Sequence, residues 1–176
     1  MPIHVLHPHT GNVITANLTG AAWVISPRYG ESYSFDRAGR LLSLFVDEHS
    51  YQRTLDHRVL ERNARSGNGL RRRELSRTER DALLAQSFDS LRNLVAALPD
   101  LNLPVQDRNQ LAQALDAILR FDPEHLAADG YLFDTLYKPI SVLPPDQYLA
   151  LVLQATEGCS WNRCTFCGLY RDRDFR

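Results

Sequence analysis

All three cysteines of the chain lie within nine residues, at Cys159, Cys164 and Cys167. An odd number of closely spaced cysteines cannot form the disulfide framework that holds many small secreted domains together. The fold must therefore depend on a hydrophobic core, and 44% hydrophobic residues in a chain of 176 are enough to build one. Free thiols also indicate a reducing compartment, so we expect a cytoplasmic protein.

Charge and hydrophobicity exclude several classes of partner. The formal net charge of -1 gives no strong field to attract nucleic acid. The one arginine run, Arg71-Arg72-Arg73, is followed by Glu74 and lacks neighbouring aromatic residues, so we expect a solvated segment rather than a phosphate contact. No run approaches the roughly 18 apolar residues that suggest a membrane span. The first residues lack the pattern of a signal peptide, so we expect no membrane partner.

The first part of the chain, residues 1–63, has the pattern of short strands separated by turns. Asp36-Arg37-Ala38-Gly39 lies between Tyr33–Phe35 and Leu41–Val46, and this spacing predicts a hairpin with Gly39 in a left-handed conformation. We therefore expect a small, mostly antiparallel sheet. Residues 64–75 are rich in arginine and poor in apolar residues, which predicts an exposed linker.

Residues 76–130 have the pattern of helices. Ser76 and Glu79 form a capping box, which marks a helix start. Apolar residues then recur at helical spacing, at Leu83, Leu84, Phe88, Leu91, Leu94, Val95 and Leu98. A second amphipathic segment follows, and Asp122-Pro123 opens a third helix that we expect Gly130 to close. Residues 1–140 are thus predicted to form an α+β domain, with a small antiparallel sheet followed by helices.

Residues 141–176 have a different pattern. Prolines are followed by Tyr148–Leu153, a continuous apolar run of strand length, which suits a strand buried on both faces of a parallel sheet. The chain then enters the cysteine segment directly. Barrel enzymes of the α/β type place their chemistry on such loops at the ends of strands.

The cysteine spacing is C-x4-C-x2-C. Three thiolates can hold three irons of a cubane cluster and leave the fourth iron free to bind a small molecule. Two alternatives stay open. Cys159, Cys164 and Cys167 with one of the six histidines could bind zinc in a binding module. Residues 1–140 could also be a non-catalytic interaction domain.

The cysteine segment resembles the cluster loop of radical S-adenosylmethionine enzymes. The residues that carry the resemblance are Thr156–Cys159, Cys164–Gly168 and Leu169–Arg171. The family's usual first gap is one residue shorter, so the spacing here is a variant. The resemblance implies that Cys159, Cys164 and Cys167 ligate a [4Fe-4S] cluster and that Phe166 lies beside the adenine of S-adenosylmethionine. It further implies reductive cleavage of that cofactor to a 5′-deoxyadenosyl radical, a reductant such as a flavodoxin or ferredoxin, and a small-molecule substrate.

The resemblance covers about the last fifth of the chain. It implies that the α+β domain is followed by the first strand and cluster loop of a TIM-like α/β barrel. Such a barrel needs roughly 200 residues, whereas nine follow Cys167. We therefore expect a fragment that is inactive alone, whose longer parent carries the catalysis. No catalytic residue can be assigned from the sequence.

Overall fold

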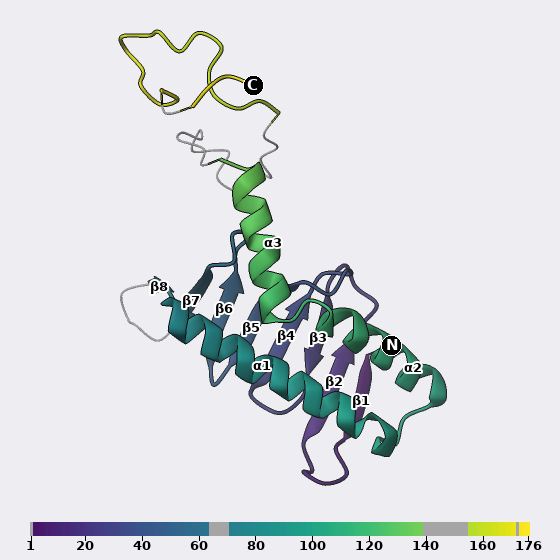
Figure 1. Cartoon of the computed structure of the whole chain (residues 1–176). Coiled ribbons are helices and arrows are strands. Elements are labelled where there is room, and N and C mark those ends of the chain that lie inside the picture. Colours follow the sequence, from purple (N-terminus) through teal and green to yellow (C-terminus); the bar gives the residue numbers. More distant parts are fainter. Residues whose placement is uncertain (1, 64–70, 139–154, 172) are drawn as a thin grey trace. The chain divides into compact units, whose positions relative to one another are not determined.

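A computed structural model of the chain describes residues 2–63, 71–138, 155–171 and 173–176 (Figure 1). The described residues contain one eight-stranded antiparallel sheet, three α-helices and a short 3-10 helix. Two compact units are present, residues 1–131 and residues 132–176. The strands are β1 (Ile3–Leu6), β2 (Val13–Asn17), β3 (Trp23–Ser26), β4 (Glu31–Phe35), β5 (Leu41–Val46), β6 (His49–Arg53), β7 (Val59–Asn63) and β8 (Arg71–Glu74). The helices are α1 (Arg77–Ala97), η1 (Leu98–Asp100), α2 (Val105–Leu119) and α3 (Pro123–Leu136).

The sheet is a meander, because its strand order is the order of the sequence. Each strand pairs antiparallel with its neighbour in the chain, so the sheet needs no crossover connection. In β4, Glu31, Tyr33 and Phe35 are buried, while the intervening serines are half-buried. This alternation gives the sheet one buried face and one more exposed face.

The turn between β4 and β5 confirms the predicted hairpin. The backbone nitrogen of Gly39 donates to the Asp36 carbonyl at 3.1 Å, and Asp36 Oδ1 accepts from the nitrogens of Ala38 and Arg40. Gly39 has a φ of +97°, a conformation that side chains rarely adopt. A Cβ atom at this position would also lie 2.4 Å from the carbonyl oxygen of Ala117 in α2. The glycine therefore allows both the turn and the close approach of a helix.

The hydrophobic core lies between the buried face of the sheet and the helices α1 and α2, which lie across that face (Figure 1). The capping box at Ser76 is confirmed, because Glu79 N donates to Ser76 Oγ at 3.3 Å and Ser76 N donates to Glu79 Oε2 at 2.8 Å. The largest fully buried side chains of the core are Ile14, Ile25, Tyr33, Phe35, Leu41, Leu84, Phe88, Leu91, Leu101, Leu111, Leu115 and Ile118.

Helix α3 extends further than the sequence predicts, since Gly130 lies inside it rather than at its end. A Cβ atom on Gly130 would lie 2.5 Å from the Cβ atom of His57, in the turn between β6 and β7. The almost fully buried Arg53 also donates to the carbonyl oxygen of Leu126 in α3 at 2.9 Å. Glycine is therefore required at position 130 because the helix packs closely against the turn at His57. The sequence alone suggested instead that this glycine ends the helix.

The predicted linker at residues 64–75 needs a correction at its C-terminal end. Arg71–Glu74 form β8, which pairs antiparallel with β7 in a register that sets Arg62 opposite Arg72. Four charged residues in a row show no apolar alternation, so this segment lacks the usual pattern of a strand. Charged edge strands are common because they discourage pairing with other chains.

The predicted fold class is wrong in its second half. The fold is an open eight-stranded antiparallel sheet with three helices, and the described residues show no beginning of a TIM-like barrel. Residues 155–171 and 173–176 form turns and bends without a strand or helix. The apolar run Tyr148–Leu153, on which the barrel prediction depended, and the predicted domain boundary at residue 140 lie outside the described residues.

Candidate metal centre

The cysteine segment is a loop closed at its base by Glu157 and Arg176. Glu157 N donates to the Arg176 carbonyl at 2.7 Å, and Arg176 N donates to the Glu157 carbonyl at 3.0 Å. The side chains add an ion pair of 2.6 Å between Arg176 Nε and Glu157 Oε2. Next to this clasp, Gly158 has a φ of +79°, and a Cβ atom on it would lie 2.6 Å from the Asp174 carbonyl oxygen. The clasp therefore requires glycine immediately before Cys159.

Two polar side chains brace the interior of the loop. Asn162 has a φ of +42°, and its side-chain nitrogen donates to the Tyr170 carbonyl at 3.0 Å. Arg171 donates from a terminal nitrogen to the Cys164 carbonyl at 2.8 Å. These contacts connect the part of the loop that carries the cysteines to its returning part. The segment thus has a defined conformation without regular secondary structure.

The three cysteines differ in exposure, and hydrogen bonds lower the pKa of Cys159. All are free thiols; Cys159 and Cys167 are half-buried, and Cys164 is exposed. The backbone N–H groups of Asn162 and Trp161 donate to the Cys159 sulfur and lower the pKa of this thiol. Thiolates are the form of cysteine that ligates metals. Cys159 is therefore already biased towards the ligand form.

The donor set fits an iron–sulfur cluster in its chemistry but is not gathered around one centre. Within the described ranges, no three His, Cys, Asp or Glu side chains lie close enough together to hold a metal ion. Three soft thiol donors on a short loop are the ligand type that clusters and zinc both use. Binding of such a group would have to draw the sulfurs together, and metal binding commonly supplies folding energy in this way.

Two aromatic residues near the cysteines, Trp161 and Phe166, are exposed to solvent. Phe166, which the family resemblance would put beside an adenine, has a fully exposed side chain. Trp161 is 67% exposed. Both rings are therefore free to cover a bound group, and the role of Phe166 stays a prediction.

Sequence reasoning did not find the clasp or the two bracing side chains. Glu157 and Arg176 stand 19 positions apart, and their pairing has no local pattern. Gly158 was the available signal, since a glycine next to a ligand commonly permits a tight turn. Asn162 also fits its position, because asparagine tolerates the left-handed conformation better than most residues.

Comparisons with known proteins give no relative. No protein-family model, no curated protein and no solved structure matches the chain. Among the described residues, none of the helices has the length and apolar character needed to cross a bilayer. The cysteine loop is therefore the basis for assigning a function to the chain.

Proposed function

We propose that the chain binds a [4Fe-4S] cluster through Cys159, Cys164 and Cys167 and is the cluster-binding part of a radical S-adenosylmethionine protein. The observation that carries the proposal is a loop with three thiols, C-x4-C-x2-C, closed by the Glu157–Arg176 clasp. Three protein thiolates on a cubane leave one iron without a protein ligand. When bound, such a cluster supplies the electron that cleaves S-adenosylmethionine to methionine and a 5′-deoxyadenosyl radical.

The chain's own residues have separate parts in this proposal. The three thiolates bind the irons, and the N–H groups of Trp161 and Asn162 stabilise negative charge on the Cys159 sulfur. Arg171 fixes the backbone at Cys164 through its hydrogen bond to the carbonyl. Phe166 is free to cover the adenine of the cofactor and exclude water. A protein with these parts belongs in the cytoplasm, accepts electrons from a flavodoxin or ferredoxin, and acts on a small-molecule substrate.

Anaerobic reconstitution with iron and sulfide tests the proposal directly. We expect a brown protein that holds about four irons per chain, with the electron paramagnetic resonance signal of a reduced cubane. Replacement of any of Cys159, Cys164 or Cys167 by serine should lower the iron content sharply. Ser160→Ala, an exposed position in the same loop, is the matched control and should keep it.

A colourless protein that retains zinc would contradict the cluster and support the zinc-binding module. Metal analysis of protein purified without oxygen separates the two outcomes.

The S-adenosylmethionine part of the proposal has its own test, since the ligand should alter the resonance signal of the reduced cluster. Phe166→Ala should weaken that response and leave the iron content unchanged. If S-adenosylmethionine did not change the resonance signal of the unmodified chain, the proposed binding of this cofactor would be wrong, while the proposed cluster binding would stand.

A further inference from the structure

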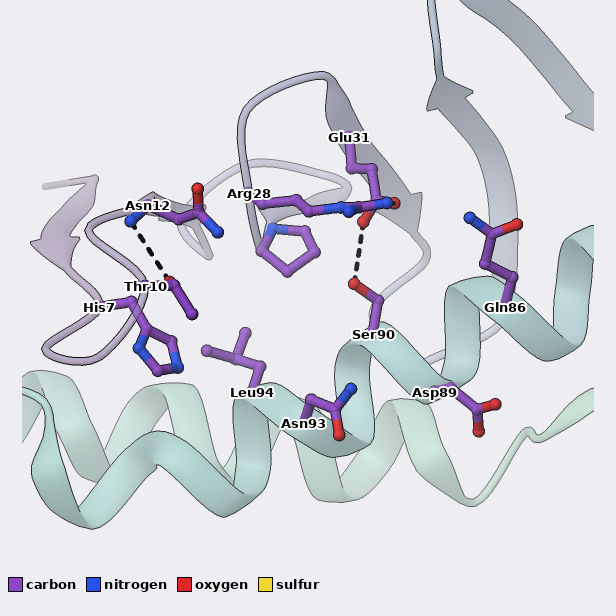
Figure 2. A pocket seen from close by; sticks show the side chains of 11 residues that line it. His7, Thr10, Asn12, Arg28, Glu31, Gln86, Asp89, Ser90, Asn93 and Leu94 are labelled. Atoms are coloured by element: carbon purple, nitrogen blue, oxygen red, sulfur yellow. Dashed lines mark hydrogen bonds and ion pairs between the residues drawn. The ribbon is translucent and has the colours of Figure 1, made fainter.

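A polar cavity of about 580 Å³ lies between α1 and two loops of the sheet, within residues 1–131 (Figure 2). Its walls come from residues 7–12 between β1 and β2, residues 27–31 at the start of β4, and residues 86–94 of α1. Small-molecule sites in proteins typically enclose about 300–1,000 Å³. The cavity is therefore large enough for a small metabolite, and the iron–sulfur proposal makes no use of it.

A buried carboxylate anchors the cavity wall. The side chain of Glu31 is 1% exposed, and it accepts hydrogen bonds from Arg28, from Tyr33 Oη at 2.6 Å and from Ser90 Oγ at 2.9 Å. Burial alone would raise the pKa of Glu31, but the three donors lower it below the usual value. Glu31 is thus an ionised group that fixes Arg28 and Ser90 in place.

Arg28 presents spare hydrogen-bond donors at the cavity. Its side chain is 47% exposed, and one terminal nitrogen donates to Glu31. A guanidinium group has five N–H donors in a planar fork. Since the ion pair with Glu31 already fixes the plane of this fork, the remaining donors face a ligand in a preset orientation.

Three amide side chains add unused donors and acceptors. In the part of the chain that the structure describes, the side chains of Asn12, Gln86 and Asn93 make no hydrogen bond, and all three line the cavity (Figure 2). Each amide offers two N–H donors and one acceptor oxygen. At His7, Nδ1 accepts from the His9 backbone nitrogen at 3.2 Å, which leaves Nε2–H as a donor.

The charges at the cavity give it no preference for an anion. The charges of Arg28 and Glu31 cancel, and Asp89 at the cavity is paired with Arg92 at 2.7 Å. With no second cation among the described lining residues, the cavity has no excess positive charge for a phosphate or carboxylate. The lining also lacks the aromatic rings that bind quaternary ammonium groups. A neutral, hydrogen-bonding ligand fits these residues best.

We propose that this cavity binds the vicinal diol of a neutral sugar ring, in a ribose or a hexose. Each of two adjacent hydroxyls can both donate and accept a hydrogen bond. Together they can pair with the oxygen and nitrogen of an amide group, or with two nitrogens of a guanidinium group. Arg28 and Asn93 present such edges from opposite sides of the cavity, and Ser90 and Asn12 supply further partners (Figure 2).

Nuclear magnetic resonance titration of the ¹⁵N-labelled full chain tests the proposal with defined probes. Adenosine and methyl α-D-glucopyranoside carry the diol in a ribose and in a hexose, respectively. We expect at least one of them to shift the signals of Ser90 and Asn93, with a dissociation constant on the order of 1 mM or tighter. 2′-Deoxyadenosine and tetrahydropyran, which lack the diol, should bind much more weakly. Adenosine binding alone assigns a ribose, and glucoside binding alone assigns a hexose.

Asn93→Ala should weaken binding of the diol probe about fivefold, the effect of one neutral hydrogen bond. Asn93 is exposed on α1, so this variant keeps the fold. The same substitution at the exposed Asn109 of α2 is the matched control and should leave binding unchanged. The proposal is overturned if neither diol probe binds at about 10 mM, if inorganic phosphate binds instead, or if Asn93→Ala and Asn109→Ala bind alike.

Discussion

Replacing Gly39 by alanine tests how the sheet and α2 fit together. Two costs add at this position. The φ of +97° is unfavourable for any side chain, which costs about 1–3 kcal/mol. The new methyl group would lie 2.4 Å from the Ala117 carbonyl oxygen, so the backbone of α2 must move, and overpacking of this kind costs about 1–3 kcal/mol more. The expected loss in free energy of unfolding is therefore about 2–6 kcal/mol.

Gly11 and Gly30 are matched controls for the backbone term. Their φ values are +69° and +81°, and a Cβ atom on either would meet nothing within 4 Å. Gly11→Ala and Gly30→Ala should therefore show the conformational cost alone, about 1–3 kcal/mol. The difference between Gly39→Ala and these two variants measures the contact between the turn and α2.

Urea unfolding followed by tryptophan fluorescence is the assay. Trp23 packs against the core and reports on residues 1–131, while Trp161 lies exposed in the cysteine loop. A Trp161→Phe background removes the second signal. If Gly39→Ala lost no more stability than the two controls, the close packing of the turn against α2 described above would be wrong.

Three further predictions concern acidity and domain independence. Burial, followed by the charges of Arg80 and Arg53, lowers the pKa of His57 from 6.5 to about 4, so the unfolded state binds its proton first as the pH falls. The free energy of unfolding should therefore fall by up to about 3 kcal/mol between pH 6.5 and pH 4. In His57→Asn, where asparagine tolerates the φ of +65°, urea unfolding at a series of pH values should show a smaller fall over this range. The folded-state pKa of Glu31 is lowered, so its contribution is full above the ordinary value of 4.5 and is lost as the pH drops through the folded-state pKa. Glu31→Gln should lower the free energy of unfolding by about 1–3 kcal/mol at neutral pH. In this variant the free energy of unfolding should also decrease less as the pH is lowered. If that decrease were the same as in the unmodified chain, other carboxylates would be responsible for it. A chain that ends after Lys138 should unfold at the same urea concentration as the full chain, since the core lies in residues 1–131; a clear drop would show that residues 139–176 support the core.

Local patterns in the sequence predicted local structure well. The capping box at Ser76 and the hairpin at Gly39 each depend on residues within a few positions of one another, so their geometry can be inferred from spacing. Gly130 was misinterpreted because the reason for the glycine, the turn at His57, lies far away in the sequence. β8 was missed because its partner strand, rather than its own residues, makes it a strand.

The candidate site divides in the same way. The three cysteines were found because they are adjacent in sequence, and their spacing suggested the chemistry directly. The clasp between Glu157 and Arg176 could not be predicted, because a charged pair at that separation has no preferred pattern. The barrel was predicted from one apolar run and the cysteine motif that follows it. The antiparallel sheet that dominates the fold is formed by other residues, in the first half of the chain.

The meander topology also affects how the protein is made. Because every strand pairs with the strand just before it, most contacts of the sheet close over short stretches of chain, and such topologies fold quickly. Synthesis proceeds from the N-terminus, and domains generally fold as units on the ribosome. Residues 155–176, which carry the thiols, follow the unit of residues 1–131 in the sequence, so this unit is able to fold before the thiols leave the ribosome.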